Sequence, residues 1–395
     1  MSLLRYLDAA ATAPLRPEAR DAMIAALDAG PANPSSVHSA GHRARALVDS
    51  ARERIAAALG ARPGELVFTS GGTEANNLAV IGLSLANPRG KHVILSPLEH
   101  PSVIESAQAL ERVHGFEVTI LPVDEYGVVD PAAVSAALRE NTTLVSISLA
   151  NGEVGTVQPV PEIAELVRER GALMHSDAVQ AAATLPVSFG RGGWPGDSVD
   201  AMTIAAHKFG GPQGAGALLL RRHLPIEPLL HGGGQEDGLR SGTENVPAIA
   251  GFAAAVEAAG RDVGTRALAL VASRDTLIRR VLAEVPGSRL TGHPTERLPG
   301  HASFVVERTS GESLLVALDS AGISASSGSA CAAGKDEPSP VLLAMGFDPV
   351  LAQTALRFTL AEPLEGDEGE ALIERIVGVL SRVVSAATRK SRDHG

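Results

Sequence analysis

Three side chains that can do chemistry lie at the ends of two short apolar runs of the sequence. Asp177 ends the run "LMHSD" (173–177), and His207 and Lys208 follow the run "AMTIAA" (201–206). A lysine held in apolar surroundings has a lowered pKa, which makes its amine a better nucleophile. Each residue also has a structural interpretation, because aspartate is a common helix N-cap and a lysine can leave a strand toward solvent.

A glycine turn supplies a third signal. In "FTSGGTEANNLAVIGL", Gly71 and Gly72 permit a tight turn, and Thr73 is placed to cap the helix that follows. The free N–H groups of a helix N-terminus attract anions, so this turn could bind a phosphate. An ordinary strand–turn–helix junction explains the turn equally well when it is considered alone.

Together these signals fit pyridoxal phosphate. Lys208 would hold the cofactor covalently, and Asp177 would keep its pyridine nitrogen protonated, so that the ring can withdraw electrons. The glycine turn would bind the phosphate group. His100, in "SPLEHPSV", follows another strand and could stack on the ring and move protons.

The elements that must position these residues alternate between strands and helices. Seven β-rich runs are predicted: 66–70, 92–96, 118–123, 144–150, 173–177, 201–206 and 216–220. Helical patterns lie between most of them, as at 43–60, where Leu47, Ala51, Ile55 and Leu59 share one face and Gly60 ends the helix. This alternation predicts an α/β fold with a mainly parallel seven-stranded sheet, whose ligands gather at the carboxyl ends of the strands.

The pattern changes after about residue 255. A long helical stretch (265–285) leads into shorter pieces and an amphipathic helix (369–384). With 395 residues the chain is too long for one compact core. We therefore predict a large cofactor-binding domain, residues 13–258, and a smaller α/β domain made of residues 1–12 and 259–395.

Composition excludes several classes of protein. The net charge of −11 disfavours direct nucleic-acid binding, and one cysteine cannot form an internal disulfide. No apolar run approaches the roughly 20 residues that span a bilayer, and the start shows no signal-peptide pattern. The sequence predicts a soluble, cytoplasmic protein that does not associate with a membrane.

Other motifs match poorly. His175 and Asp177 lack a third metal ligand, and no acidic residue lies between His38 and His42, although Gly41 does, so no metal site is predicted. "GSACAAGKD" has the wrong length for a P-loop, and "HGGGQE" has no G-x-S-x-G nucleophile to accompany it.

A series of motifs along nearly the whole chain resembles the cysteine desulfurase family. The matching segments are "YLDAAATAPLRPEA", "NPSSVH", "VFTSGGTEANNLA", "LEHPSV", "NGEVGTVQP", "HSDAVQ", "AHKFGGPQGAGAL", "HGGGQEDGLRSGTENV", "SSGSAC" and "LRFTL". The resemblance implies a homodimeric, pyridoxal-phosphate-dependent enzyme with the aspartate aminotransferase-like fold, which converts L-cysteine to L-alanine.

The resemblance also implies roles for individual residues. Lys208, Asp177 and His100 keep the roles given above. The other positions that match are Gln180 for the ring's phenolic oxygen; Gly72, Thr73 and His207 for the phosphate; Thr243 for the phosphate site of the partner subunit; and Asn33 and Arg357 for the substrate carboxylate.

Cys331, the only cysteine, would be the second nucleophile. Its thiolate would take the substrate's sulfur as a persulfide and pass it to an acceptor protein, such as an iron–sulfur scaffold or a thiolation enzyme. The small residues around it would let the thiol travel between the two. Nine residues separate "SSGSAC" from "VLLAMG", and this long loop resembles that of the housekeeping group of the family.

Two positions depart from the family pattern. Gly152 replaces an asparagine that contacts the cofactor, and Ala205 replaces a serine that binds the phosphate. These departures leave open a rival of the same fold, a selenocysteine or other C–S lyase that needs no enzyme thiol. A non-catalytic sulfur carrier is a further alternative, which the presence of Lys208, Asp177 and His100 disfavours.

Overall fold

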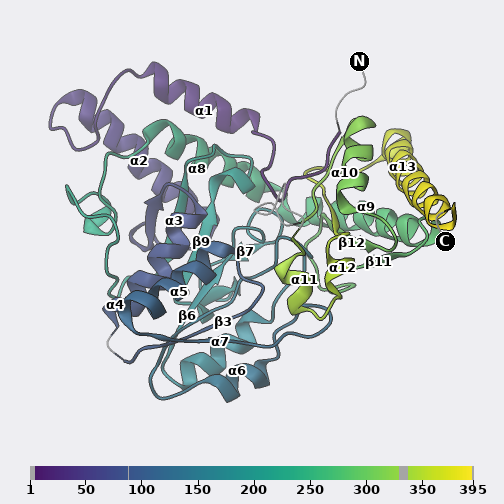
Figure 1. Ribbon diagram of the computed structural model, residues 1–395. Helices are drawn as coiled ribbons and strands as arrows, with labels where there is room; N and C mark the ends of the chain where they lie inside the picture. The colour runs from purple at the N-terminus through teal and green to yellow at the C-terminus, as the bar shows by residue number, and fades with distance from the viewer. Residues whose placement is uncertain (1–4, 88, 329–336, 394–395) are drawn as a thin grey trace.

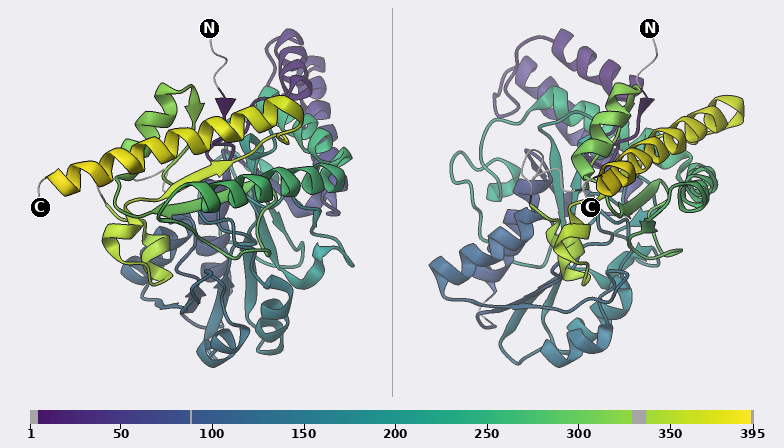
Figure 2. Two further views of the ribbon diagram at one scale, coloured as in Figure 1. Left: turned by 90° about the vertical axis from the view of Figure 1, so that its right-hand side faces the viewer. Right: turned by 45° about the vertical axis from the view of Figure 1, so that its right-hand side comes forward.

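The computed structural model describes residues 5–87, 89–328 and 337–393. Cys331 lies outside these residues. Figure 1 shows a large body around the central sheet and a smaller lobe that carries the C-terminal helix. The turned views of Figure 2 show the long helix α13 (Gly366–Asp393) along the outside of this lobe, beside α9 (Val263–Glu284).

The large body is built on a seven-stranded sheet, as the sequence predicts. In spatial order its strands are β2 (Leu66–Thr69), β10 (Gly216–Leu220), β9 (Ala201–Ala205), β6 (Leu173–Asp177), β5 (Thr142–Ser146), β3 (His92–Leu95) and β4 (Glu117–Ile120). Strands β9, β6, β5, β3 and β4 run parallel to one another, and β10 is antiparallel to both of its neighbours. Most of these strands are buried along their whole length, which explains their continuous apolar runs.

Helices cover both faces of this sheet (Figure 1). They are α1 (Pro17–Asp28), α2 (Ser39–Ala58), α3 (Gly72–Asn77), α4 (Leu83–Ala86), α5 (Pro101–His114), α6 (Pro131–Ala137), α7 (Val160–Glu169) and α8 (Val246–Arg261). A π-helical turn, η2 (Leu78–Gly82), joins α3 to α4 and makes one continuous helical segment.

The predicted buried face of α2 is partly wrong. The helix begins at Ser39, four residues before the predicted start, because the His38 side chain accepts a hydrogen bond from the Gly41 N–H. Ala51 and Ile55 are buried as predicted, but Leu47 is 37% exposed. The helix packs on α8 through a neighbouring face that starts at Ala44 and Val48, since small side chains let the two helices approach closely.

The smaller lobe has its own three-stranded antiparallel sheet. Its strands are β11 (Ser288–Leu290), β12 (His301–Val306) and β14 (Leu356–Thr359), with β12 in the middle. Helices α9, α10 (Gly311–Ser320) and α13 pack with this sheet around a second apolar core, and α11 (Pro340–Ala344) and α12 (Pro349–Ala352) lie nearby. Two short paired strands, β7 (Val187–Ser188) and β8 (Trp194–Pro195), belong to the large body.

The N-terminal segment joins this second core. Strand β1 (Arg5–Tyr6) pairs in parallel with β13 (Ile323–Ser324), and Leu7 is buried among the apolar residues of the lobe. The chain therefore enters the large body only after it has crossed the lobe. The domain limits given above stay a prediction.

Within the described residues, no helix is both long and apolar enough to span a bilayer.

Candidate active site

The ends of β6 and β9 bring the predicted chemical groups to one edge of the sheet. Asp177 is paired with Thr203 across these two strands, so Lys208, five residues further on, lies at the same edge. Gly72 lies there too, because a Cβ at Gly72 would be 3.0 Å from Val179 and 3.5 Å from Ala205. The glycine turn therefore packs tightly against the residues that follow Asp177 and precede Lys208.

Thr73 does not cap the helix, contrary to the sequence prediction. Helix α3 begins one residue earlier, at Gly72, with Gly71 as its N-cap and no side-chain cap. Thr73 is exposed inside the first turn, where the N–H groups have no intrahelical acceptor. These N–H groups remain available for an anion.

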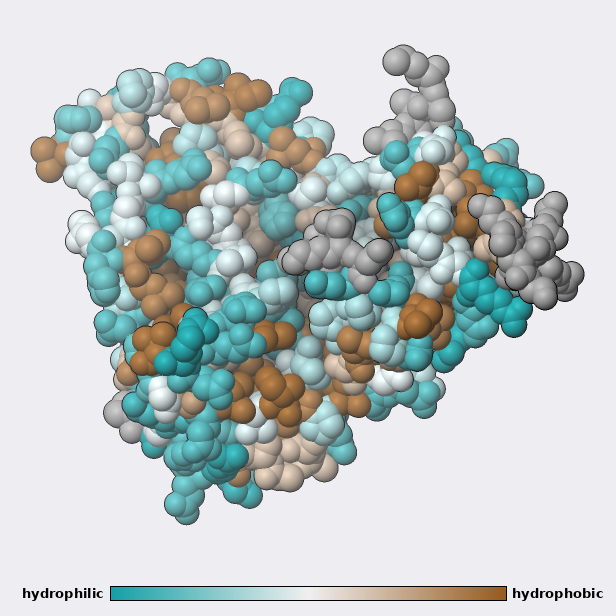
Figure 3. Space-filling model, in the orientation of Figure 1, coloured by the Kyte–Doolittle hydropathy of each residue, from teal (hydrophilic) through white to brown (hydrophobic). Residues whose placement is uncertain are grey.

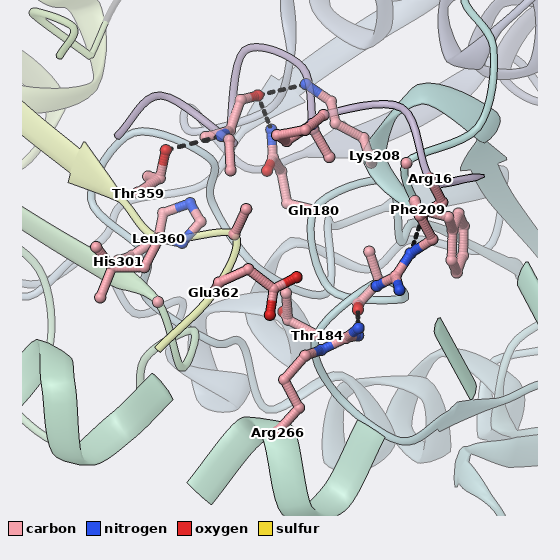
Figure 4. Close-up of a pocket in the computed structure, with 18 residues that line it drawn as sticks. Arg16, Gln180, Thr184, Lys208, Phe209, Arg266, His301, Thr359, Leu360 and Glu362 are labelled. Atoms are coloured by element: carbon pink, nitrogen blue, oxygen red, sulfur yellow. Dashed lines mark hydrogen bonds between the residues drawn. The ribbon is translucent and has the colours of Figure 1, made fainter. Parts of the chain in front are cut away.

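Lys208 is held against the N-terminal segment. Its Nζ donates hydrogen bonds to the carbonyl oxygens of Ala10 and Ala11, the latter at 2.9 Å. Burial, with a smaller contribution from the nearby Arg357, lowers the pKa of Lys208 to about 8. Figure 4 shows the Lys208 amine and the Gln180 amide converging on the same carbonyl, that of Ala10. A large share of this amine is therefore neutral near pH 8.

Asp177 and His100 belong to one hydrogen-bond network. The Asn76 amide donates to Asp177 Oδ2 at 2.7 Å and to Ser102 Oγ at 2.9 Å. The Ser102 hydroxyl lies 2.7 Å from His100 Nδ1, which also accepts from the Ser102 N–H at 3.1 Å. Nδ1 is thus an acceptor, so the neutral ring of His100 carries its proton on Nε2.

Burial shifts the other titratable groups toward neutral forms. Partial burial lowers the pKa of His100, while Asp177 acts in the opposite direction and Lys208 adds to the lowering. Burial lowers the pKa of His207 to about 4 and raises that of Glu99 to about 8. Glu99 Oε1 accepts from the Ser148 N–H at 2.9 Å, and its second oxygen is buried without a hydrogen-bond partner. The site thus offers neutral groups that can accept or give a proton near pH 7.

Arg357 closes the site from the smaller lobe. It is only 3% exposed, and its Nη2 donates to Asp8 at 2.7 Å. Its Nη1 donates to the carbonyl oxygens of Gly152 and Gly328 at 2.8 and 3.0 Å. Its Nε is buried and has no hydrogen-bond partner. The Nε donor of this guanidinium therefore remains free for a ligand.

Gly152 and Gln180 are in direct contact. A Cβ at Gly152 would lie 2.7 Å from Gln180 Nε2, which donates to the Ala10 carbonyl at 3.1 Å. The Gln180 side chain thus fills the space that a larger residue at position 152 would take.

Some predicted site residues are not brought together. Asn33 is exposed and accepts a hydrogen bond from the Ser35 N–H, and Thr243 is also exposed. No hydrogen bond or ion pair within residues 5–87, 89–328 and 337–393 joins either residue to Lys208 or Arg357. Cys331 lies outside the described residues.

His175, which was weighed as a metal ligand, is a core residue. Its two ring nitrogens bond to the hydroxyls of Ser146 and Thr203, and burial lowers its pKa to about 3. In the part of the chain that the structure describes, no group of three or more His, Cys, Asp or Glu side chains could hold a metal ion.

Several residues of the site escaped the sequence analysis. Asn76 could have been noticed, because it lies one helical turn after Gly72 on the same helix. The only sequence signal for Ser102 is its position as the second residue after His100. Asp8 gives no signal, since it lies 349 residues from its partner Arg357.

Comparisons with known proteins agree with this fold. The family model "Aminotransferase class-V" matches residues 5–363. A solved NifS-like protein superimposes with a TM-score of 0.87 at 34% identity, covering 96% of this chain and all of that one. A solved structure titled "SspA in complex with cysteine" gives a TM-score of 0.77 at 33% identity, covering 91% of this chain and 99% of the other.

Curated relatives extend the comparison. Cysteine desulfurase IscS of Dictyoglomus turgidum is 44% identical over 90% of this chain and 89% of the relative. An IscS-like cysteine desulfurase of Mycobacterium tuberculosis is 42% identical over 97% of this chain and 98% of the relative. The chain belongs to the cysteine desulfurases within the class-V aminotransferase family, and it is a pyridoxal-phosphate-dependent enzyme.

The residues at the sheet edge fit this cofactor. A nucleophilic lysine amine, a buried carboxylate and the free N–H groups of α3 match its aldehyde, its ring nitrogen and its phosphate. The buried Asn76 Oδ1 has no partner, although its amide nitrogen holds Asp177. Gly72 lets the turn approach the ends of β6 and β9 closely enough to complete the cradle.

Proposed function

We propose that this enzyme converts L-cysteine to L-alanine and transfers the sulfur to Cys331. The observation that carries the proposal is the convergence of a lysine of lowered pKa with the Asp177–Asn76–Ser102–His100 network at one sheet edge. A neighbour that is 33% identical was solved with cysteine, which supports this substrate class.

The sheet edge would bind and tune the cofactor. Lys208 would attach it covalently, Asp177 would pair with its ring nitrogen, and Gln180 would reach its phenolic oxygen. Gly72, Thr73 and His207 would surround the phosphate. When bound, pyridoxal phosphate supplies an electron sink that weakens the substrate's C–S bond. His100 would move a proton through Nε2, since its Nδ1 is occupied by Ser102.

The smaller lobe would bind the substrate. The buried Nε of Arg357 is a donor left for the substrate carboxylate, because Asp8 and two backbone carbonyls accept from its Nη2 and Nη1. Asp8 would keep the guanidinium in place. Asn33 remains a proposed contact on the basis of the family resemblance alone.

Cys331 would accept the sulfur. Its thiolate attacks the substrate sulfur, so that an S–S bond forms while the C–S bond breaks. The electron pair of the C–S bond stays with carbon, which is protonated to give L-alanine. The resulting persulfide would then pass its outer sulfur to the thiol of an acceptor protein, of the iron–sulfur scaffold or thiolation type. A thiol-independent lyase is not favoured, because the relatives named above are cysteine desulfurases.

A homodimer would complete the site. Thr243 is exposed, and the family resemblance gives it a role at the partner subunit's phosphate. Apolar side chains gather on the outer face of α1 (Figure 3), where Ile24 and Leu27 are 45% and 62% exposed. Such a patch is typical of a protein interface.

A single-turnover experiment tests the proposal. Holoenzyme is mixed with L-cysteine without reductant, and both alanine and the mass of the protein are measured. We expect about one alanine per chain, from the one-thiol stoichiometry, and one added sulfur on the peptide that contains Cys331. Alanine without added sulfur on that peptide would contradict the transfer.

A further inference from the structure

A cavity of about 130 Å³ lies where the large body meets the smaller lobe (Figure 4). Its walls come from the N-terminal segment, the residues after β6 and β9, helix α9, and the strands β12 and β14 with the residues next to them. Gly72, His100 and Asp177 are not among the described residues that line it, so it is a different space from the cofactor site at the sheet edge. Ala10 lies between the two, because it lines the cavity while its carbonyl accepts from Lys208. The proposed reaction assigns this cavity no role.

Three residues of the cavity wall each carry a buried polar atom that has no hydrogen-bond partner within the described residues. The atoms are Thr184 Oγ1, Arg266 Nη1 and His301 Nε2. Arg266 is 8% exposed and His301 is 5% exposed, so bulk water does not satisfy them. Buried polar atoms are nearly always paired, and leaving them unpaired is costly. Three such atoms around one cavity therefore indicate a binding site for a polar molecule.

Two of these atoms are neighbours that suit an anion. Arg266 Nη2 donates to the carbonyl of Ala183 at 2.8 Å, which places the guanidinium beside the next residue, Thr184. Nη1 of the same guanidinium lies 3.7 Å from Asp262 Oδ1, too far for a hydrogen bond, and the Asp262 side chain is 60% exposed. A guanidinium N–H and a hydroxyl can both donate to the oxygens of one carboxylate.

The charges around the cavity also favour an anion. Burial lowers the pKa of Arg266, and the charge of Arg16, which lines the cavity too, lowers it in addition. The two guanidinium groups therefore repel each other, and an anion near both would reduce this repulsion. Glu362 lies between His301 and the two arginines in Figure 4, but it is exposed, so water and salt screen its charge.

Apolar side chains make up much of the remaining wall. They include Ala9, Ala13, Pro14, Ala183, Leu360 and Ala361. Hydrocarbon atoms of a ligand can pack on such side chains, whereas an inorganic anion would leave them without contacts. His301 adds no charge, because burial, and after it the charge of Arg357, lowers the pKa of its ring well below the ordinary value. The cavity thus combines an anion-binding end with an apolar body.

We propose that this cavity binds a small organic carboxylate. The carboxylate group accepts hydrogen bonds from Arg266 Nη1 and the Thr184 hydroxyl, and the hydrocarbon body packs on the alanines of the wall. Arg357, the proposed partner of the substrate carboxylate, is not among the described residues of the wall, so the two sites are distinct. The inference therefore does not depend on the proposed reaction. The alternative is that the cavity holds only water.

Propionate and its uncharged isostere propionamide test whether a carboxylate is bound. Titration calorimetry gives the dissociation constants of both for the parent enzyme loaded with pyridoxal phosphate. We expect a dissociation constant on the order of 1 mM for propionate, which so small a ligand can reach. Propionamide should bind at least about tenfold more weakly, because it loses the hydrogen bonds between charged groups. Absence of propionate binding, propionamide binding of equal affinity, or tighter binding of sulfate would each overturn the inference.

The variant Thr184→Val tests whether the carboxylate lies in the cavity, because it removes the hydroxyl and keeps the shape of the side chain. The matched control is Thr309→Val, since Thr309 Oγ1 is also buried without a partner in the described part of the chain but does not line the cavity. T184V should raise the dissociation constant of propionate about tenfold, and T309V should leave it unchanged. A parent-like value in T184V would overturn the inference, because propionate bound at Arg357 would not respond to Thr184. An equal loss of affinity in both variants would also overturn it.

Discussion

The cofactor side and the substrate side of the active site are built in different ways. On the cofactor side, Asp177 ends β6, Lys208 follows the neighbouring parallel strand β9, and Asn76 of α3 and Ser102 of α5 connect Asp177 to His100. On the substrate side, Arg357 from the smaller lobe meets Asp8 from the N-terminal segment. The cofactor side forms when the central sheet forms. The substrate side forms only when distant parts of the chain have come together.

This difference has a chemical consequence. The cofactor side is a fixed set of groups whose protonation is set by burial, as the lowered pKa of Lys208 and His207 shows. The substrate side depends on contacts between the lobe and the large body, such as the hydrogen bond from Arg357 to the carbonyl of Gly152. Changes on the first side should therefore affect cofactor chemistry, and changes on the second should affect substrate binding.

The largest expected effect is on the cofactor side. Lys208→Ala removes the amine, and we expect turnover of L-cysteine to fall by at least about a thousandfold, since no other group there can replace a covalent nucleophile. The visible absorption of the lysine-bound cofactor should also disappear. Lys91→Ala is the control, because Lys91 is exposed and its Nζ donates to the backbone carbonyl of His114, away from the sheet edge that holds Lys208. Substantial turnover by K208A would contradict the role of Lys208.

The pH dependence of cofactor binding should follow Lys208. Because the folded protein lowers its pKa to about 8, the reactive neutral form should fall about tenfold for each pH unit below 8 and level off above it. The rate at which apoenzyme binds pyridoxal phosphate, followed by absorbance from pH 6 to 10, measures this. A midpoint near the ordinary lysine value of about 10.4 would show that burial does not tune the amine.

A moderate effect is expected on the substrate side. Asp8→Asn keeps the shape but removes the charge that holds Arg357, and we expect KM for L-cysteine to rise about tenfold, the usual cost of a lost charged hydrogen bond. The cofactor spectrum should stay that of the parent. The test is to measure steady-state kinetics and the cofactor absorption spectrum of the Asp8→Asn variant and of the parent. An altered spectrum with an unchanged KM would contradict the separation of the two sides.

The smallest effect concerns the two departures from the family pattern. Ala205→Ser adds a hydroxyl beside Gly72. It should lower the dissociation constant of pyridoxal phosphate by about threefold to tenfold, which is the contribution of one hydrogen bond. Gly152→Asn should increase the affinity for pyridoxal phosphate by a smaller factor, because the Gln180 side chain must first leave the Ala10 carbonyl. Equilibrium dissociation constants of A205S and of A205S/G152N measure both changes. A dissociation constant of A205S equal to that of the parent would refute the missing-hydroxyl explanation.

The sequence was sufficient where local pattern and sheet topology decide the outcome. Asp177 and Lys208 were predicted because each ends or follows an apolar run, and parallel strands place such ends at one edge. Leu47 was misassigned because the apolar pattern cannot say which face meets α8. Thr73 was misassigned because helix starts vary by one or two residues. The pairing of Arg357 with Asp8 had no local signal at all.

The central claim is that Cys331 accepts the substrate's sulfur. The most direct test measures sulfide released from L-cysteine, with a reductant present, by pyridoxal-phosphate-loaded parent and Cys331→Ala enzymes. We expect the parent to release sulfide and the variant to release almost none, although its cofactor spectrum should be unchanged. Equal release by both enzymes would show a thiol-independent lyase and would contradict the account.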